Sequence, residues 1–268
     1  MVRRPLGNHH DRPDTLLVTP DTTQTDAVTS GTGRELAAAL RDVVTPDRVV
    51  LWDFDGPICR LFAGHSAERV ARELVEWLEQ QGLSGLLSDE EREHPDPQVV
   101  LRAVDRRHPG SDLVTELEAR LTDRERHAVG SAQPTPHADP LIRTWSALGG
   151  RFAVTTNNSA RTVRDYLGGR GLLGCFSPHL YGRTIRLDLL KPDPHCLLRA
   201  LNAMGAAAGS ALMIGDSPED REAAERAGVA FLGYARDGDK GAALRKAGAR
   251  VVVDSLETVL HVLRSAQA

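Results

Sequence analysis

The stretch VVLWDFDGPIC, residues 49–59, decides the fold. Four apolar residues lead directly to two aspartates, Asp53 and Asp55, which are separated by one phenylalanine and followed by a Gly-Pro pair. A short apolar run of this kind predicts a buried strand. Two like charges at the end of a buried strand repel each other and resist desolvation. The arrangement therefore indicates a functional site at the point where the strand ends.

Other short apolar runs recur at wide spacing along the chain, at residues 151–156, 210–215, 230–233 and 250–254. Each of them follows a helix-like segment that ends in glycine. Apolar strands that alternate with helices predict an α/β fold with a doubly wound, mainly parallel sheet covered on both faces. In such a sheet, ligands bind beyond the carboxyl ends of the strands.

Residues 64–133 have a different pattern, since apolar residues recur there at helical spacing and no strand-like run interrupts them. This pattern predicts an all-helical cap domain, inserted after the first strand into a catalytic core of residues 47–63 and 134–268. Within it, Thr122 and Glu125 fit a capping box that starts a further helix. Gly64 is the expected hinge residue between core and cap.

The first 46 residues form the third predicted part. Residues 1–32 are rich in Thr, Asp, Pro and His without periodicity, which predicts a disordered or loosely packed extension. A short amphipathic helix is expected near residues 34–44.

Composition excludes several classes of protein. The net charge of −4 is unlike that of a chain that neutralises many nucleic-acid phosphates. No apolar run is long enough to cross a bilayer, and no secretory signal follows the N-terminal arginines. The three cysteines are scattered, without metal-site spacing. We expect a cytoplasmic protein with no nucleic-acid or membrane partner, and its oligomeric state stays open.

Polar residues follow the other predicted strands as well. Thr156 and Asn157 end the second strand and suit a phosphate oxygen, and Asp216 ends the third with Asp220 just beyond it. Lys191, one of only three lysines, lies just before an expected helix that has Asp193 as N-cap and Pro194 as its first residue. Each motif alone is more often a turn or a helix start. Their joint placement at strand ends indicates one site.

The motifs DFDGPI, TTNNS, KPDP and GDSPED, in this order, resemble those of the haloacid dehalogenase superfamily, which consists mostly of Mg²⁺-dependent phosphatases. The position of the helical insertion is similar to that of the C1-type cap of its phosphoglycolate phosphatase-like members. The resemblance covers about residues 47–255 and implies a Rossmannoid core. Pro57 departs from the pattern, since many family phosphatases carry Thr or Val there.

The resemblance also implies a role for each acidic residue. Asp53 is the implied nucleophile and a Mg²⁺ ligand, and Asp55 is the general acid and base, whose backbone carbonyl also binds the metal. Asp216 completes the protein ligands, and Asp220 is a ligand or supports one. The presence of an acid at Asp55 favours phosphate ester chemistry, because dehalogenases and phosphonatases of the superfamily lack it.

Thr156, Asn157 and Lys191 are the implied phosphate-binding residues, with Thr156 and Lys191 stabilising the transferring phosphoryl group. This chemistry agrees with general requirements. Phosphoryl transfer needs in-line positioning and neutralisation of the equatorial oxygens, and a carboxylate can serve as the nucleophile. The leading hypothesis is a Mg²⁺-dependent phosphatase of a small phosphorylated metabolite, acting through an aspartyl-phosphate.

Several alternatives stay open. A phosphomutase of the β-phosphoglucomutase type would share both aspartates. A phospho-accepting signalling module would place its Lys-Pro after all acidic residues, whereas here Asp216 follows Lys191. A serine esterase built on Ser217 lacks an evident His–Asp pair. A non-catalytic binding protein on the same fold is a further alternative, and the substrate is not predicted.

Overall fold

The computed structural model describes Gly33 and residues 35–265 of the 268-residue chain. The expectation for residues 1–32 lies outside the described residues. Residues 35–43 are helical, close to the short helix expected near 34–44. Leu40 and Val44 are buried, so this stretch contributes to the core of the compact unit Ala37–Ala268.

The centre of this unit is a six-stranded sheet in which every neighbouring pair is parallel. Its order is β5-β4-β1-β6-β7-β8. The strands are β1 (Val49–Trp52), β4 (Arg151–Ser159), β5 (Leu180–Arg183), β6 (Ala211–Gly215), β7 (Ala230–Tyr234) and β8 (Val251–Val253). The predicted α/β class and parallel sheet are confirmed. Strand β5 was not predicted, because LYGR contains a glycine and is only half buried at the sheet edge.

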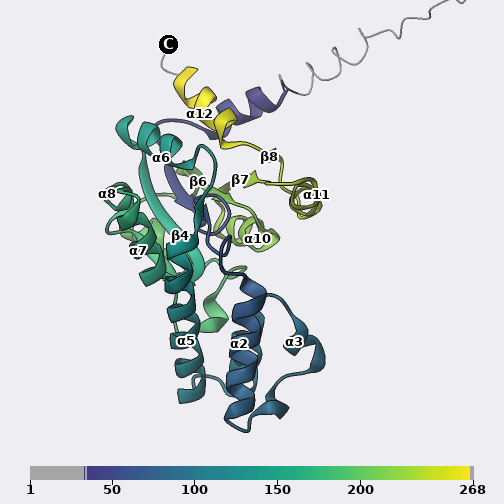
Figure 1. Ribbon diagram of the computed structural model, residues 1–268. Helices are drawn as coiled ribbons and strands as arrows, with labels where there is room; N and C mark the ends of the chain where they lie inside the picture. Colours follow the sequence, from purple (N-terminus) through teal and green to yellow (C-terminus); the bar gives the residue numbers. More distant parts are fainter. Residues whose placement is uncertain (1–32, 34, 266–268) are drawn as a thin grey trace, which may run out of the picture. The chain divides into compact units, whose positions relative to one another are not determined.

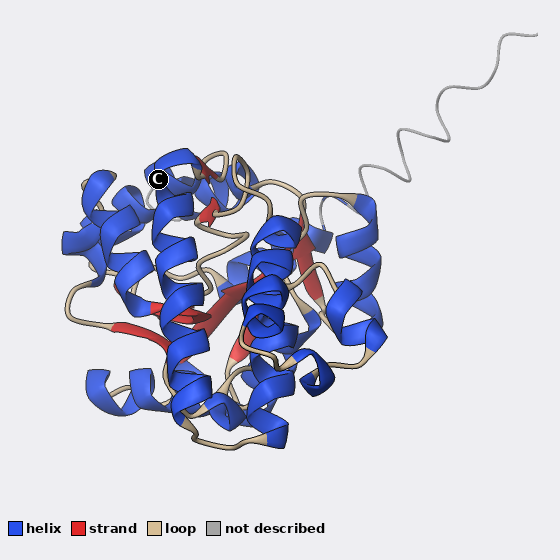
Figure 2. Cartoon of the chain, turned by 60° about the horizontal axis from the view of Figure 1, so that its bottom comes forward, coloured by secondary structure: helices blue, strands red, loops and turns tan. Residues whose placement is uncertain are grey.

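Helices cover both faces of the sheet (Figure 2). They are α6 (Ala138–Ala147), α7 (Ala160–Gly169), α8 (Leu173–Phe176), α9 (His195–Met204), α10 (Pro218–Ala227), α11 (Gly238–Lys246) and α12 (Leu256–Ser265). In β1, alternate residues point to opposite faces. Val49 and Leu51 pack with α9 and α10. Trp52 lies on the other face, edge-on to Phe152, which also contacts Trp145 of α6.

Helix α9 begins one residue later than predicted. Pro194 precedes the helix rather than opening it, and His195 is the first helical residue. Asp193 still has the expected capping chemistry, since its Oδ1 accepts the His195 N–H at 2.9 Å. Short 3₁₀ turns lie just before α9 and β6, at η3 (Leu187–Leu189) and η4 (Ala208–Ser210).

Between β2 (Cys59–Arg60) and β3 (Gln133–Pro134) the chain forms only helices (Figure 1). We call them the helical insertion. They are α2 (Ala67–Gln80), η1 (Ser84–Leu86), α3 (Asp89–Glu93), α4 (Pro97–Arg107), α5 (Asp112–Ala128) and η2 (Val129–Ser131). The apolar sides of α2, α4 and α5 form a hydrophobic cluster with Leu87, Leu187 and Leu190 that is distinct from the cluster between the sheet and α9 and α10.

The helix start predicted at Thr122 is wrong. Helix α5 is continuous from Asp112 to Ala128, with Ser111 as its N-cap, and Thr122 and Glu125 lie in its interior. Both side chains are buried and point to Arg183 of β5. The residues that resemble a capping box therefore serve a tertiary contact.

The two ends of the insertion lie side by side. β2 and β3 pair in antiparallel fashion, with Cys59 opposite Pro134. A Cβ atom added to Gly64 would lie 2.5 Å from the Ser131 Cβ atom, and Gly64 has no positive φ. Gly64 therefore permits close approach of the two connections, which is a steric role. None of the described helices is long and apolar enough to cross a membrane.

Candidate active site

The sheet topology brings the predicted residues to one edge. Strand β1 lies between β4 and β6, and the three strands are parallel, so their carboxyl ends meet. Asp53 follows β1, Asp216 follows β6, and Thr156 lies near the end of β4. The chain passes to β4 and β5 on one side of β1 before it returns to β6 on the other. The site therefore lies at the switch point of an open α/β sheet, where ligands usually bind.

A tight loop after β1 sets the two aspartates. Gly56 has φ +118°, and a Cβ atom there would lie 2.3 Å from the Asp216 Cγ atom. Only glycine fits this conformation and this close approach. The Asp55 Oδ1 accepts the Leu61 N–H at 2.9 Å, which fixes the carboxyl group. Burial raises the pKa of Asp55 to about 6.

Lys191 is the cation at the centre of the site. Its side chain is 2% exposed, and its ammonium group donates to the Asp53 Oδ1 at 2.8 Å, to an Asp220 oxygen and to the Thr155 carbonyl at 3.0 Å. Burial opposes the charge, but the Asp220 and Asp53 carboxylates outweigh it and hold the pKa of Lys191 above its usual value. The pKa of Asp53 is raised by burial and by Asp220, although Lys191 counteracts this.

Asp220 is fully buried, and both of its carboxylate oxygens are engaged. Oδ1 accepts from Lys191, while Oδ2 accepts the backbone N–H groups of Asp216 at 3.0 Å and Ser217 at 3.1 Å. Ser217 caps helix α10 and donates its hydroxyl to the same oxygen at 2.9 Å. This geometry favours a supporting role for Asp220, in which it orients Lys191 and the Asp216 loop.

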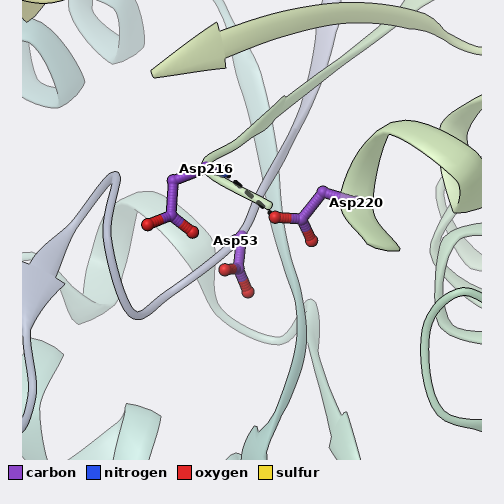
Figure 3. Close-up of side chains that lie close together, drawn as sticks. All are labelled: Asp53, Asp216 and Asp220. Carbon is purple, nitrogen blue, oxygen red and sulfur yellow. Dashed lines mark hydrogen bonds between the residues drawn. The ribbon is translucent and has the colours of Figure 1, made fainter. Parts of the chain in front are cut away.

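Three carboxylates converge at this edge (Figure 3). Asp53, Asp216 and Asp220 each offer an oxygen within 4.8 Å of the other two, and all three are buried. Burial raises the pKa of Asp216 to about 7, against the influence of the Lys240 ammonium group that contacts it. Buried like charges need a cation, and oxygen donors of this kind are those that Mg²⁺ prefers. The residues present therefore fit a magnesium ion, with Asp53 and Asp216 as the ligands least engaged by other groups.

Thr156 and Asn157 have different surroundings. The Thr156 hydroxyl is buried and lines the cavity described below, hydrogen-bonded to Asn158. The Asn157 side chain holds the backbone of Lys191 from both sides, since its Nδ2 donates to the Lys191 carbonyl at 3.1 Å and its Oδ1 accepts the Lys191 N–H at 2.8 Å. Asn157 therefore positions Lys191 with the amide that was expected to bind phosphate.

A cavity of about 530 Å³ opens above these groups. Its floor is the aspartates with Thr156 and Lys191, and its opposite wall comes from the helical insertion, including Gln98, Val99 and Arg102. The Arg102 guanidinium donates to the Lys191 carbonyl at 2.8 Å, so α4 contacts the loop that carries Lys191 directly. The size and the polar lining suit a small anionic molecule.

Sequence reasoning missed four charged residues around the site: Arg102, Glu125, Arg183 and Lys240. Lys240 could have been noticed as one of only three lysines. The arginines carry no local signal, and Glu125 carries only the capping-box spacing that wrongly predicted a helix start, because all three reach the site only through the tertiary fold.

The family of the chain is shown by comparison with known proteins. Residues 48–228 match the family described as haloacid dehalogenase-like hydrolase. Because this match covers more than half of the sequence, the chain belongs to the haloacid dehalogenase-like hydrolases. The resemblance drawn from the four motifs is confirmed.

The individual curated proteins that match this chain share a minority of the aligned residues with it. A phosphoglycolate phosphatase of Rhodospirillum rubrum is 35% identical over 131 residues, which cover 46% of this chain and 54% of that protein. The chain thus spans about half the length of the curated relatives that it matches first.

Two solved structures share the fold. A predicted phosphatase from Clostridium acetobutylicum has a TM-score of 0.59 and 16% identity, over 83% of this chain and 99% of that one. A putative beta-phosphoglucomutase from Thermotoga maritima has a TM-score of 0.55 and 19% identity, over 81% and 99%. At these identities the likeness concerns the fold alone.

Proposed function

We propose that the protein is a Mg²⁺-dependent phosphatase of a small phosphorylated metabolite, acting through a phosphoryl group on Asp53. The observation that carries this proposal is the buried group of Asp53, Asp216 and Asp220 held together by Lys191 at the carboxyl edge of the sheet. Such a group combines a carboxylate nucleophile, oxygen ligands for a divalent cation and a cation for phosphoryl oxygens.

In the first step, an Asp53 carboxylate oxygen attacks phosphorus, and the bond from phosphorus to the ester oxygen breaks. Lys191 lies 2.8 Å from Asp53 and offers its N–H groups to the equatorial oxygens. The Thr156 hydroxyl donates to the same phosphoryl group. Asp55 gives a proton to the leaving oxygen, so the alcohol departs neutral.

In the second step, a water attacks the phosphorus of the aspartyl-phosphate, and Asp55 takes the proton of that water. Inorganic phosphate leaves, Asp53 is regenerated as a carboxylate, and Asp55 is again protonated. Mg²⁺, held by Asp53 and Asp216, would offset the charge of the phosphoryl oxygens when it is bound. Asp220 takes no part in bond changes and keeps Lys191 and the Asp216 loop in place.

The helical insertion, which falls within the predicted cap of residues 64–133, is the proposed cap, which excludes water from the cavity and contacts the leaving group. Arg102 is its cation beside the site, donating to the Lys191 carbonyl. A guanidinium there suits a substrate with a second anionic group, such as a carboxylate. Relatives named phosphoglycolate phosphatase make phosphoglycolate the first compound to test.

Phosphate release from a panel of phosphoesters tests the proposal. Purified protein with Mg²⁺ should release inorganic phosphate from phosphoglycolate or another small phosphoester, and Asp53→Asn should abolish this release. No release from any compound would contradict it. The phosphomutase alternative retains support from the shared aspartates. Conversion of a sugar phosphate to its isomer without net phosphate release would favour that alternative.

A further inference from the structure

A buried ion pair lies beside the site, outside the group of reacting residues. Arg183, at the end of β5, donates from Nη1 to the Glu125 Oε1 of α5 at 2.6 Å. The two side chains are 0% and 1% exposed. A buried pair of this kind is weak evidence for stability, because desolvation offsets most of the attraction. The other hydrogen bonds of Arg183 and Glu125 therefore indicate a role other than stability.

The Arg183 guanidinium joins α5 to the end of strand β4 that carries Thr156 and Asn157. Nε donates to Glu118 at 3.1 Å, and Nη2 donates to the Thr122 hydroxyl at 3.2 Å. Glu118 lies about two turns of α5 before Glu125, and Thr122 lies about one turn before it. Nη1 also donates to the Asn157 carbonyl at 3.0 Å. The arginine thus fixes the Glu125 carboxylate and the strand end that carries Thr156 relative to each other.

Glu125 in turn holds the residues that follow Thr156. Its Oε1 accepts from the Asn158 Nδ2 at 3.1 Å, and its Oε2 accepts the Ser159 N–H at 2.9 Å. The Asn158 backbone N–H then donates to the Thr156 Oγ1 at 3.2 Å, and the Asn158 Oδ1 accepts from the Thr156 hydroxyl at 3.2 Å. A continuous chain of buried hydrogen bonds runs from Arg183 through Glu125 and Asn158 to Thr156.

We propose that Glu125 and Asn158 are positioning residues for the Thr156 hydroxyl, and that Arg183 holds them in place. The inference rests on the proposed function, since it takes Thr156 to bind the transferring phosphoryl group. When Thr156 donates to a phosphoryl oxygen, its Oγ1 still accepts from the Asn158 backbone N–H. The Asn158 side chain orients this peptide group through its bond to Glu125, so Asn158→Ala misplaces the N–H without removing it. Helix α5, a part of the insertion, thereby helps to order the phosphate-binding strand end.

A set of single variants tests this role. In Asn158→Ala and Glu125→Gln, kcat should fall about 10- to 100-fold, since a small misplacement of a group that contacts the transition state has effects of this size. KM should change by less than about 3-fold, because the lost interaction is one made mainly in the transition state.

Glu118→Gln is the matched control. Glu118 also accepts from Arg183, at 3.1 Å, and from the Thr122 hydroxyl, but among the described residues it has no hydrogen bond to Asn157, Asn158 or Ser159. Its kcat should stay within about 2-fold of wild type, as expected for a residue outside the positioning chain. An unchanged kcat in both Asn158→Ala and Glu125→Gln, or an equal loss in Glu118→Gln, would overturn the proposal.

The double variant Glu125→Leu with Arg183→Met separates positioning from stability. Apolar side chains of similar volume commonly replace a buried ion pair without loss of stability. Its thermal midpoint should therefore recover relative to either single variant, while kcat stays low. Recovery of kcat together with the midpoint would show a merely structural role. Should the double variant not fold, Asn158→Ala, which leaves the ion pair intact, still decides the question.

Failure of the proposed function has a different signature. If the wild-type protein hydrolyses no phosphoester, the phosphatase assignment falls. Binding of orthovanadate, which imitates the phosphoryl group in the transition state, then tests the positioning chain without turnover, measured by calorimetry in the presence of Mg²⁺. Weaker binding in Asn158→Ala than in Glu118→Gln would support the proposal, and equal binding would overturn it.

Discussion

Replacement of Lys191 by methionine should lower the unfolding free energy of the protein more than replacement of an exposed charged residue. The Lys191 side chain is 2% exposed, and its ammonium group binds two buried carboxylates, Asp53 at 2.8 Å and Asp220. Removing one partner of a buried ion pair costs about 3–5 kcal/mol of unfolding free energy, because the other charge stays buried and unpaired. For a chain of 268 residues that corresponds to a thermal midpoint lowered by about 5–9 °C.

Lys240→Met is the matched control. Lys240 also contacts a buried carboxylate, that of Asp216, but its own side chain is 34% exposed. Solvent screens such a pair, so its loss should cost about 1 kcal/mol or less. Urea unfolding of both variants at pH 7, followed by circular dichroism, measures the difference directly.

The deficit of Lys191→Met should also depend on pH. Burial and Asp220 raise the pKa of Asp53 above its model-compound value of 3.8, and Lys191 is what opposes them. Without Lys191, the folded state therefore binds more protons than the unfolded state at pH values above 3.8, because Asp53 stays protonated there. Its unfolding free energy therefore falls as pH rises. The deficit relative to wild type should be larger at pH 8 than at pH 5.

Two results would refute this reasoning. A Lys191→Met protein as stable as Lys240→Met would mean that the buried carboxylates do not depend on Lys191. A deficit that grows as the pH falls from 8 to 5 would have the wrong sign for unpaired carboxylates.

Three further outcomes are expected. Gly56→Ala should weaken Mg²⁺ binding measured by calorimetry, because its Cβ atom would lie 2.3 Å from the Asp216 Cγ atom; Gly82→Ala, with φ +73° and no atom within 4 Å, should leave binding unchanged. Arg102→Ala should raise KM for phosphoglycolate more than for a phosphoester with a neutral leaving group, measured by steady-state kinetics. Asp55→Asn should lower hydrolysis about 10²- to 10⁴-fold in a phosphate-release assay, the usual contribution of general acid and base catalysis. Equal Mg²⁺ binding by Gly56→Ala and Gly82→Ala would contradict the first expectation. An equal rise in KM for both substrates of Arg102→Ala would contradict the second, and full activity of Asp55→Asn the third.

Much of the core could be predicted from the sequence because its signals are local. The runs before Asp53 and Asp216 are short, apolar and followed by polar residues, and a parallel sheet brings such ends together. Strand β5 was missed because an edge strand needs no continuous apolar run. Lys191 stood out through the rarity of lysine in the chain, and the structure places it against Asp53.

The surroundings of the site could not be predicted in the same way. Thr122 and Glu125 have capping-box spacing, but Arg183, 58 residues beyond Glu125, gives them a tertiary partner that keeps α5 unbroken. The Asn157 amide looked like a phosphate ligand, whereas its backbone contacts with Lys191 depend on a loop 34 residues away. Such roles follow from the fold and leave no trace in local spacing.

The phosphorylated residue itself is the most direct test of the account. The protein is mixed with Mg²⁺ and a phosphoester that it hydrolyses, and the reaction is quenched in acid within milliseconds. The digested protein is then analysed by mass spectrometry for the peptide that contains Asp53. The account predicts a phosphoryl group on Asp53, absent from Asp53→Asn. A phosphoryl group on any other residue, or turnover by Asp53→Asn at the wild-type rate, would contradict it.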